Sequence, residues 1–207
     1  MDDLKVVVIG GAPLSGKSIA ARMLATRLGF GTLCIDDLGQ AIGAVTSRSS
    51  HPAFHLMDDC DYREYYVSRS IAQLTDDAEQ YHAAIWPAVK EVIARHATWG
   101  NPVAIEGWAI RPEGIAAVGL GGVKAIWLVT NREVLEVRVR RDAAFHSGAS
   151  DEEKMIRHFV ARGVWLDERI RVAAFQLGMP TIEVSTSTSA AEVGDRCLRA
   201  VGLTEAR

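Results

Sequence analysis

Cysteine is scarce in this sequence, and the few cysteines that occur form no recognisable pattern. The three residues Cys34, Cys60 and Cys197 are widely separated along 207 residues. A small secreted fold held by disulfides would carry cysteines at much higher density, and a structural zinc site would place them in close pairs. The scarcity argues against both classes and favours a reducing compartment, so we expect a cytoplasmic protein.

Long hydrophobic runs and a strong excess of charge are also missing. No apolar run approaches the roughly 20 residues that a membrane-spanning helix needs, so we expect no membrane partner. The formal net charge is −3, with 23 basic and 26 acidic residues. Binding to nucleic acid phosphates needs clustered basic residues, which makes nucleic acid an unfavoured partner.

A glycine-rich motif near the start stands between an apolar run and a helical pattern. Residues 5–10 read KVVVIG, and residues 11–18 read GAPLSGKS, which matches Gly-x-x-x-x-Gly-Lys-Ser. The glycines allow backbone N–H groups to turn toward phosphate oxygens, and the following helix adds its positive end. In this motif the lysine reaches the β- and γ-phosphates, and the serine hydroxyl binds Mg²⁺. We expect ATP and Mg²⁺ as cofactors, Lys17 as a catalytic residue and Ser18 as a metal ligand. The residues expected to bind the nucleotide are Gly11, Ala12, Pro13, Leu14, Ser15, Gly16, Lys17 and Ser18.

Short apolar runs alternate with helical patterns along the rest of the chain. The expected strands cover residues 5–10, 32–35, 103–105, 123–129 and 181–184. This alternation predicts an α/β fold, a three-layer α/β/α sandwich around a five-stranded parallel sheet. Ligands of such sheets bind beyond the carboxyl ends of the strands, so residues at those ends are the candidates for chemistry.

One domain is expected over 1–207, with a helical substrate-binding insertion at about 40–100 and a lid at about 138–157. Inside the insertion, the pattern predicts one helix over residues 61–82 and a second after it, with Pro87 marking a helix start or a kink. Three Ser/Thr-x-x-Glu spacings, at Thr130, Ser150 and Ser189, predict that later helices start there.

Carboxylates follow two of the expected strands. Asp36 and Asp37 come after the second strand, where a carboxylate can orient an acceptor hydroxyl and accept its proton. Asp36 is the first choice for this catalytic role. Asp37 is a candidate substrate-binding residue, with helix capping as the alternative. Glu106 ends the third strand and can hold a water of the Mg²⁺ shell or position the substrate, since magnesium uses few carboxylates directly.

Arginines and one tryptophan complete the candidate site. Arg111 can bind an anionic group of the acceptor, and Trp108 can either stack on the substrate or pack in the core. Arg138 and Arg141 are three residues apart and share a helix face, so one of them can neutralise charge on the transferred phosphoryl group as a catalytic residue. A solvated basic face is the alternative. The arginines of the next helix, Arg157, Arg162 and Arg169, are secondary candidates.

With these residues in place, the chain resembles the P-loop small-molecule kinases, the adenylate-kinase-like group, and is most similar to 2-phosphoglycerate kinase-like ATP-binding proteins. The resemblance rests on residues 10–18, 35–38 and 105–107 and on the helix with Arg138 and Arg141. It implies strand order 2-3-1-4-5, Mg-ATP as the donor, a basic lid, and a last loop at residues 185–188 near the adenine. Glu106 stands where an ordinary Walker B motif has Asp.

The sequence thus favours an ATP-dependent kinase, a phosphotransferase that moves the γ-phosphoryl group of ATP to a hydroxyl of a small anionic metabolite. Two alternatives stay open: an ATP-binding regulatory or switch module without phosphotransfer, and a kinase of an RNA end. A GTPase is disfavoured because it would carry Asp-x-x-Gly after the third strand and Asn-Lys-x-Asp after the fourth, where residues 106–108 and 131–133 read EGW and NRE.

Overall fold

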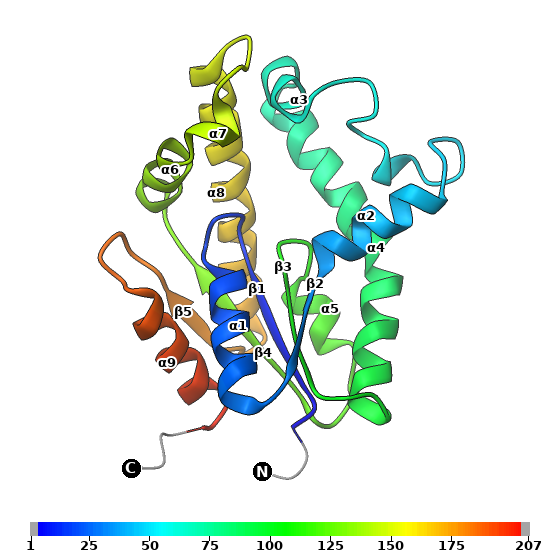
Figure 1. The fold of residues 1–207 in the computed structure, drawn as a ribbon, viewed down its shortest axis with the longest axis vertical. Helices are drawn as coiled ribbons and strands as arrows, with labels where there is room; N and C mark the ends of the chain where they lie inside the picture. The colour runs from blue at the N-terminus through cyan, green and yellow to red at the C-terminus, as the bar shows by residue number, and fades with distance from the viewer. Residues whose placement is uncertain (1–3, 204–207) are drawn as a thin grey trace.

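A five-stranded parallel sheet forms the centre of the computed structural model, which describes residues 4–203 of the predicted 1–207 domain (Figure 1). The strands are β1 (Val6–Gly11), β2 (Gly31–Cys34), β3 (Val103–Gly107), β4 (Val123–Val129) and β5 (Thr181–Glu183). Their order is β2-β3-β1-β4-β5, with parallel pairing between neighbours. The predicted fold class and strand order are therefore confirmed.

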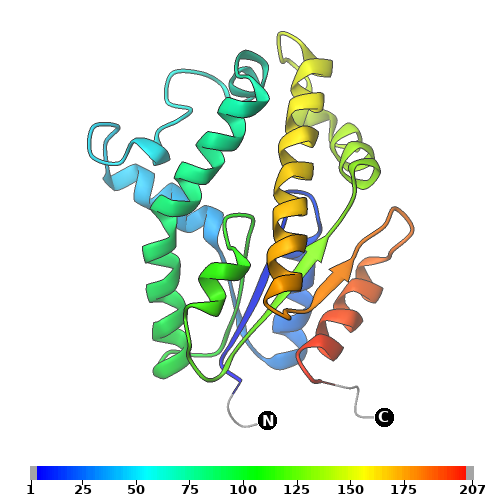
Figure 2. The ribbon, with the colours of Figure 1, turned by 180° about the vertical axis from the view of Figure 1, so that it is seen from behind.

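Helices cover both faces of the sheet. The helices α1 (Lys17–Leu28) and α9 (Ala190–Ala200) lie on the face toward the viewer in Figure 1. The opposite face, seen in Figure 2, carries α4 (Ile71–Thr98), α5 (Pro112–Ala116) and α8 (Glu152–Gln176). Successive side chains of a strand point to opposite faces. Accordingly, Val6 and Val8 of β1 pack in one core cluster, whereas Val7 and Ile9 pack in the other. Burial of β1 on both sides explains its unbroken apolar sequence.

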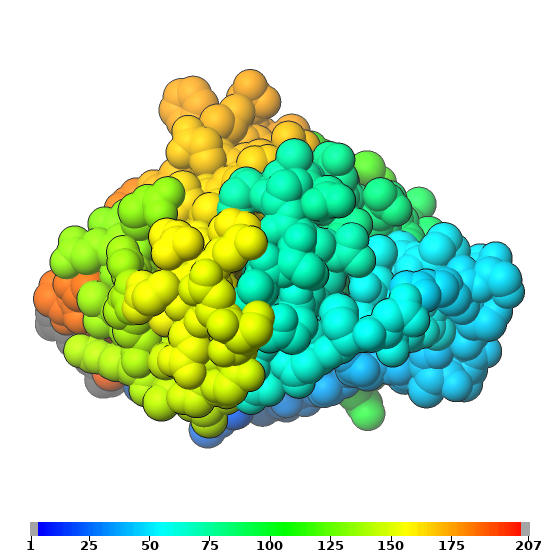
Figure 3. All heavy atoms as spheres, turned by 90° about the horizontal axis from the view of Figure 1, so that it is seen from above, coloured from blue at the N-terminus to red at the C-terminus, as the bar shows by residue number. Residues whose placement is uncertain are grey.

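The remaining helices lie above the carboxyl ends of the strands. They are α2 (Ile35–Val45), the short 3₁₀ helix η1 (Pro52–Phe54), α3 (Tyr62–Ser68), α6 (Arg132–Arg141) and α7 (Ala143–His146). A third core cluster, with Leu74, Leu135 and Phe159, joins α4, α6 and α8 beside α3. From above, Figure 3 shows α3 in teal between the start of α8 in yellow and the segment around residue 50 in cyan. These elements form the upper wall of the molecule, over the strand ends.

The helix boundaries in residues 61–98 differ from the prediction. The first helix ends at Ser68, and α4 then continues from Ile71 through Pro87 to Thr98. The new helix begins here because Ser70 caps α4 and Gln73 completes a capping box with it. The two side chains accept hydrogen bonds from two backbone N–H groups that would otherwise have no partner. Pro87 therefore lies inside α4, and the alternative that a helix starts at Pro87 is wrong.

Two of the three predicted helix starts are shifted by one residue. The cap of α6 is Asn131 rather than Thr130, and the cap of α8 is Asp151 rather than Ser150. Thr130 is buried and its N–H donates to Asp167 at 2.6 Å, which leaves the next residue to cap the helix. The third prediction, Ser189 as the cap of α9, is confirmed. In the described part of the chain, no helix is both long enough and apolar enough to span a membrane.

Candidate functional site

The loop between β1 and α1 has a backbone shape that depends on its glycines. Gly16 has φ 103° and Gly11 has φ 150°, both in the region that favours glycine. A Cβ added at Gly11 would lie 2.4 Å from the backbone oxygen of Leu128. Leu14, with φ 63°, is in the left-handed region despite its side chain. Such strain persists only where surrounding contacts hold it, and it is common where a loop must present its backbone to a ligand.

Lys17 lies inside this loop, at the first position of α1. Its side chain is 7% exposed, and its ammonium donates to the carbonyl oxygen of Ala12 at 2.7 Å. Burial lowers the pKa of Lys17 to about 8, while the negative charges of Glu106 and Asp36 act in the opposite direction. Within the described residues, the buried hydroxyl of Ser15 has no hydrogen-bond partner. A buried cation and an unsatisfied buried hydroxyl in one glycine loop suit an anionic ligand.

The outer side of the loop borders a cavity of about 660 Å³. Its lining combines loop residues 14–18 with Arg138 and Arg141 of α6 and with Thr188, in the loop after β5. Sites for small molecules and cofactors have volumes of roughly 300–1,000 Å³, so the cavity has the size for a nucleotide. The structure thus brings the predicted phosphate loop, both predicted arginines and the predicted last loop to one place.

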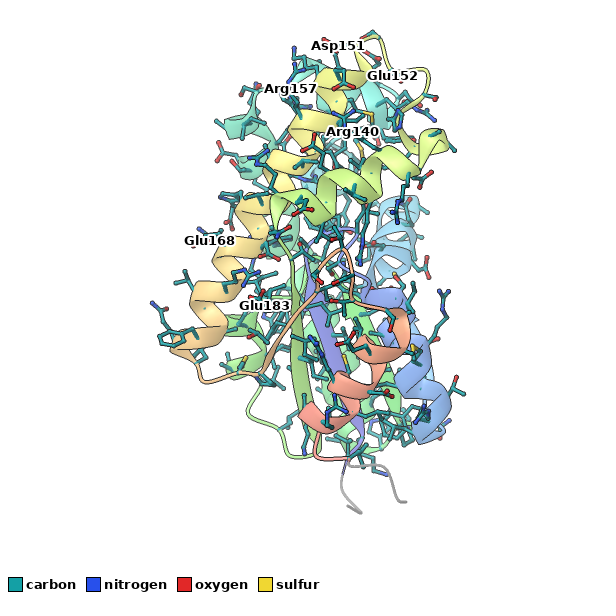
Figure 4. All side chains as sticks on the ribbon, turned by 90° about the vertical axis from the view of Figure 1, so that its left-hand side faces the viewer. Arg140, Asp151, Glu152, Arg157, Glu168 and Glu183 are labelled. Atoms are coloured by element: carbon teal, nitrogen blue, oxygen red, sulfur yellow. The ribbon has the colours of Figure 1, made fainter. Side chains whose placement is uncertain are left out.

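The arginines of α6 differ in their orientation. Arg138 donates from Nη1 to the carbonyl oxygen of Leu14 at 2.6 Å. Burial, with a contribution from the charge of Arg141, lowers the pKa of Arg138. Arg140 instead forms ion pairs with Glu136 and Glu153 on the outer surface of α6 (Figure 4). The shared face that the spacing predicts for Arg138 and Arg141 is therefore the face toward the cavity.

Asp36 lies in the first turn of α2, within electrostatic reach of Lys17. Partial loss of solvent raises the pKa of Asp36, the charge of Lys17 opposes the shift, and Glu106 and Asp37 add to it. The indole of Trp108 is close enough to the Asp36 carboxylate to oppose part of the rise in its pKa. Asp36 and Asp37 are both exposed, and the helix cap is Cys34, so neither aspartate caps α2. The acidic pair instead lies at the positive end of the helix, where negative charge is favoured.

Glu106 is 6% exposed at the end of β3, which pairs directly with β1 as expected. Burial raises the pKa of the Cys34 thiol to about 11, and the charge of Glu106 adds to the shift. Ser18 is exposed at the start of α1. Across residues 4–203, no group of three or more His, Cys, Asp or Glu could hold a metal ion. A serine hydroxyl and a carboxylate are oxygen ligands of the kind that Mg²⁺ uses, together with several waters and phosphate oxygens.

Arg111 lies apart from the phosphate loop. Its Nε donates to Nδ1 of His82 at 2.6 Å, and its Nη2 pairs with Glu79 at 2.8 Å. Burial, assisted by the charge of Arg111, lowers the pKa of His82 to about 2. The 470 Å³ cavity beside Arg111 includes neither Asp36 nor the phosphate loop in its lining. The role predicted for Arg111 in acceptor binding stays a prediction.

A further cavity, of about 670 Å³, begins at Asp36 and extends under α2, η1 and α3. Trp108 and Tyr81 line it, and their rings stack at 5.3 Å with planes 7° apart. Arg162 of α8 also lines it, whereas the sequence placed Arg162 only among secondary candidates. The close spacing of Tyr62, Tyr65 and Tyr66 in the sequence indicates an aromatic helix face. That spacing does not reveal that the distant helix α8 supplies a cation, Arg162, to the same cavity.

Comparison of the sequence with protein-family models found no match, and comparison with curated proteins found none either. Solved structures share the fold. The shikimate kinase from Acinetobacter baumannii in complex with shikimate is 16% identical, with a TM-score of 0.54 over 96% of this chain and 91% of that one. A sugar kinase from Janibacter sp. is 14% identical, with a TM-score of 0.55 over 97% and 95%.

A gluconokinase from Sinorhizobium meliloti is 17% identical, with a TM-score of 0.52 over 97% of this chain and 92% of that one. Identities this low establish the fold alone, so the chemistry has to be inferred from the residues of the site. The protein has the P-loop α/β/α fold that these kinases share.

Proposed function

We propose that this protein is an ATP-dependent kinase that transfers the γ-phosphoryl group to a hydroxyl of a small, anionic metabolite. The observation that carries the proposal is the position of Asp36 between two cavities. Its carboxylate is close enough to Lys17 for the charges to interact, and it lines the second cavity. A nucleotide-binding module needs only the first cavity. The solved structures of similar fold support the proposal because they are a shikimate kinase, a sugar kinase and a gluconokinase.

The phosphate loop would hold the triphosphate of ATP. Backbone N–H groups of residues 11–18, other than Pro13, would surround the phosphates, and the ammonium of Lys17 would exchange the carbonyl of Ala12 for phosphate oxygens. The Ser18 hydroxyl and, through water, Glu106 would hold Mg²⁺. When bound, the ion neutralises charge on the β- and γ-phosphates. The loop between residues 185 and 188 would lie near the adenine, since Thr188 lines the same cavity.

Asp36 would orient the acceptor hydroxyl and accept its proton. A raised pKa brings a carboxylate closer to the range in which it works as a general base. The indole of Trp108 favours the charged form of the carboxylate, which is the form that accepts a proton. Phosphoryl transfer depends mainly on positioning and on electrostatic stabilisation. Asp36 would position the acceptor hydroxyl, and Lys17 would stabilise the charge of the phosphates.

Arg138 and Arg141 would stabilise the charge on the transferred group, as part of a lid over residues 138–157. The lid is tied to the proposed insertion at residues 40–100. The hydroxyl of Tyr62 donates to the carbonyl of Phe145 at 2.6 Å, and Ser150 donates to the carboxylate of Glu64 from both its N–H and its hydroxyl at 2.7 Å. A lid joined to the insertion would close over both cavities together and exclude water from the transfer.

The experiment that tests the proposal follows ADP formation with Mg-ATP and a library of hydroxylated metabolites, against a blank without acceptor. We expect an acceptor-dependent rate that Lys17→Ala abolishes. Undiminished turnover in Lys17→Ala protein would contradict the proposal. ATP binding with blank-level turnover throughout the library would instead favour a regulatory ATP-binding module, and turnover with RNA ends alone would favour an RNA kinase.

A further inference from the structure

The 670 Å³ cavity beyond Asp36 is unusually rich in aromatic side chains. Eight of the 14 aromatic residues in the chain line it, and these include all four tyrosines. They come from separate segments, since Phe54, Tyr81 and Phe145 belong to η1, α4 and α7. Aromatic rings bury large apolar areas and stack on flat ligand groups. The concentration of rings in one cavity indicates a ligand with a flat apolar body.

The charged groups of this cavity are mostly paired within the protein. Asp58 accepts from His55 at 2.8 Å. Asp77 accepts from the hydroxyl of Tyr65 at 2.9 Å and pairs with Arg69 at 3.4 Å. Asp36 faces Lys17 and serves the proposed transfer. Once these pairs are set aside, Arg162 is the lining cation that has no ion pair with a carboxylate in the described part of the chain.

Arg162 is held in a defined orientation by aromatic rings. Its guanidinium carbon lies 4.9 Å from the ring centre of Tyr66 and 5.0 Å from that of Trp108. Its charge is one reason that the pKa of Tyr66 is less raised than burial alone would make it. Contacts of this kind stabilise a cation without neutralising it. The planar guanidinium keeps further N–H donors for an anion, which it binds in bidentate fashion.

Trp108 connects Arg162 to the proposed base. Its indole lies beside Asp36 in the cavity lining and favours the charged form of that carboxylate, and the ring of the same indole lies 5.0 Å from the guanidinium carbon of Arg162. Tyr81 stacks on the indole and fixes its plane. A ligand whose hydroxyl is at Asp36 can therefore place an anionic group at Arg162 while its body contacts the aromatic wall.

We propose that the phosphoryl acceptor is a hydroxylated aromatic acid whose anionic group binds Arg162. This inference rests on the kinase function proposed above and defines its second substrate. In the transfer, the acceptor oxygen forms a bond to the γ-phosphorus as the bond from that phosphorus to the β,γ-bridging oxygen breaks. The acceptor proton passes to Asp36, and ADP leaves. Arg162 takes no part in these bond changes; it sets which acceptors can place a hydroxyl at Asp36.

The test uses the full chain and three aromatic hydroxy acids as probes: 3-phenyllactate, mandelate and indole-3-lactate. Each is paired with its primary amide, and lactate is the control without a ring. Titration calorimetry without nucleotide measures their binding, and a separate titration measures the non-hydrolysable analogue AMP-PNP. We expect at least one acid to bind about ten or more times more tightly than its amide and than lactate, because a hydrogen bond between charged groups is stronger than one to a neutral amide.

Variants of two arginines on the same helix make the test specific. Arg162→Gln should remove the preference for acid over amide, and Arg162→Lys should keep part of it because the charge remains. Arg169→Gln is the matched control: Arg169 lies on α8 outside the cavity lining and pairs with Glu79 at 3.1 Å on the surface. It should leave the preference unchanged. If Arg162→Gln does not fold, as judged by its thermal unfolding, the inference is tested by Arg162→Lys, whose preference for acid over amide should be smaller than that of the wild type.

Equal binding of acid and amide, equal binding of aromatic acids and lactate, or an unchanged preference in Arg162→Gln would each overturn the inference. So would the failure of all three acids to bind protein that still binds AMP-PNP. A failure of the kinase proposal gives a different result, since it would show as absent AMP-PNP binding or absent turnover while the acid preference persists.

Discussion

The ammonium of Lys17 donates a hydrogen bond to the carbonyl oxygen of Ala12, five residues earlier, across the inside of the phosphate loop. The side chain is buried and shares the loop with the unpartnered hydroxyl of Ser15. One backbone carbonyl is a weak partner for a desolvated cation, and this is why the pKa of Lys17 is lowered to about 8. A triphosphate would compensate the charge far better, so proton binding at Lys17 and nucleotide binding should favour each other.

The affinity for AMP-PNP should therefore fall as the pH rises above about 8. Below this pH Lys17 is charged in the free protein, and above it the side chain is neutral. A bound triphosphate favours the charged form and raises the pKa, so binding above pH 8 requires uptake of a proton. The expected decrease is up to about tenfold per pH unit. Titration calorimetry from pH 7 to pH 10, in buffers of different ionisation enthalpy, measures both the affinity and the proton uptake.

The control for this dependence is Lys17→Met, which should bind AMP-PNP weakly and without proton uptake near pH 8. The same pH dependence in wild type and variant would show that another group is responsible.

Arg138→Ala should lower kcat by about 100-fold, the cost of removing one positioned donor to developing charge. Arg138 lies over the phosphate loop, with Nη1 2.6 Å from the Leu14 oxygen, and it lines the nucleotide cavity. The affinity for AMP-PNP should fall by less than about tenfold, because the group acts mainly on the transition state. Steady-state kinetics with the acceptor found by library screening, together with nucleotide titrations, separate the two effects.

The neighbouring Arg140 provides a matched comparison on the same helix. It pairs with Glu136 and Glu153 on the outer surface (Figure 4). Arg140→Ala should keep kcat within about twofold, since exposed ion pairs contribute little. A similar loss of kcat in both variants would argue for a general effect on the lid rather than a specific role of Arg138.

The elements that depend on local patterns could be predicted from the sequence. The loop at residues 11–18, the five strands and the order of the sheet follow from glycine spacing, apolar runs and the known arrangement of similar chains. Asp36 and Glu106 were found because the ends of parallel strands meet at one edge of a sheet. Arg138 and Arg141 were placed on one face by helical spacing. Apart from the order of the sheet, which follows from the resemblance, each of these inferences depends on a short stretch of sequence.

The features that depend on packing between distant segments could not be predicted. Trp108 was left between two roles, and its contacts with Asp36 and Arg162 arise only when β3, α2 and α8 pack together. Arg111 follows the correct strand but turns toward α4, where His82 and Glu79 hold it. No sequence period records such contacts. The break between α3 and α4 is a different case, because the capping signal at residues 70–73 was present.

Asp36→Asn should lower kcat by about 10²–10⁴-fold, the range for loss of a general base, while AMP-PNP affinity stays close to that of wild type. In the wild type, kcat/KM should fall as the pH decreases through the pKa of Asp36. That pKa is raised, so the fall should begin at a higher pH than an ordinary aspartate would give. Pre-steady-state and steady-state rates across pH 4–8 measure both effects.

The control is Asp76→Asn, which removes the same charge from an exposed position on α4. It should have wild-type rates and the wild-type pH profile. If Asp36→Asn protein transfers phosphate at the normal rate, Asp36 is not the general base and another group accepts the proton of the acceptor.

Gly10→Ala should destabilise the protein by about 1–3 kcal/mol through overpacking. A Cβ at Gly10 would lie 1.9 Å from Cζ3 of Trp127, a side chain with no exposed surface that has little room to shift. Gly31→Ala is the matched control on β2, where the nearest atom would be 3.9 Å away, and its effect should stay within about 0.5 kcal/mol. Urea unfolding of both variants measures the free energies of unfolding. Equal stability of Gly10→Ala and wild type would contradict the close packing of β1 against Trp127.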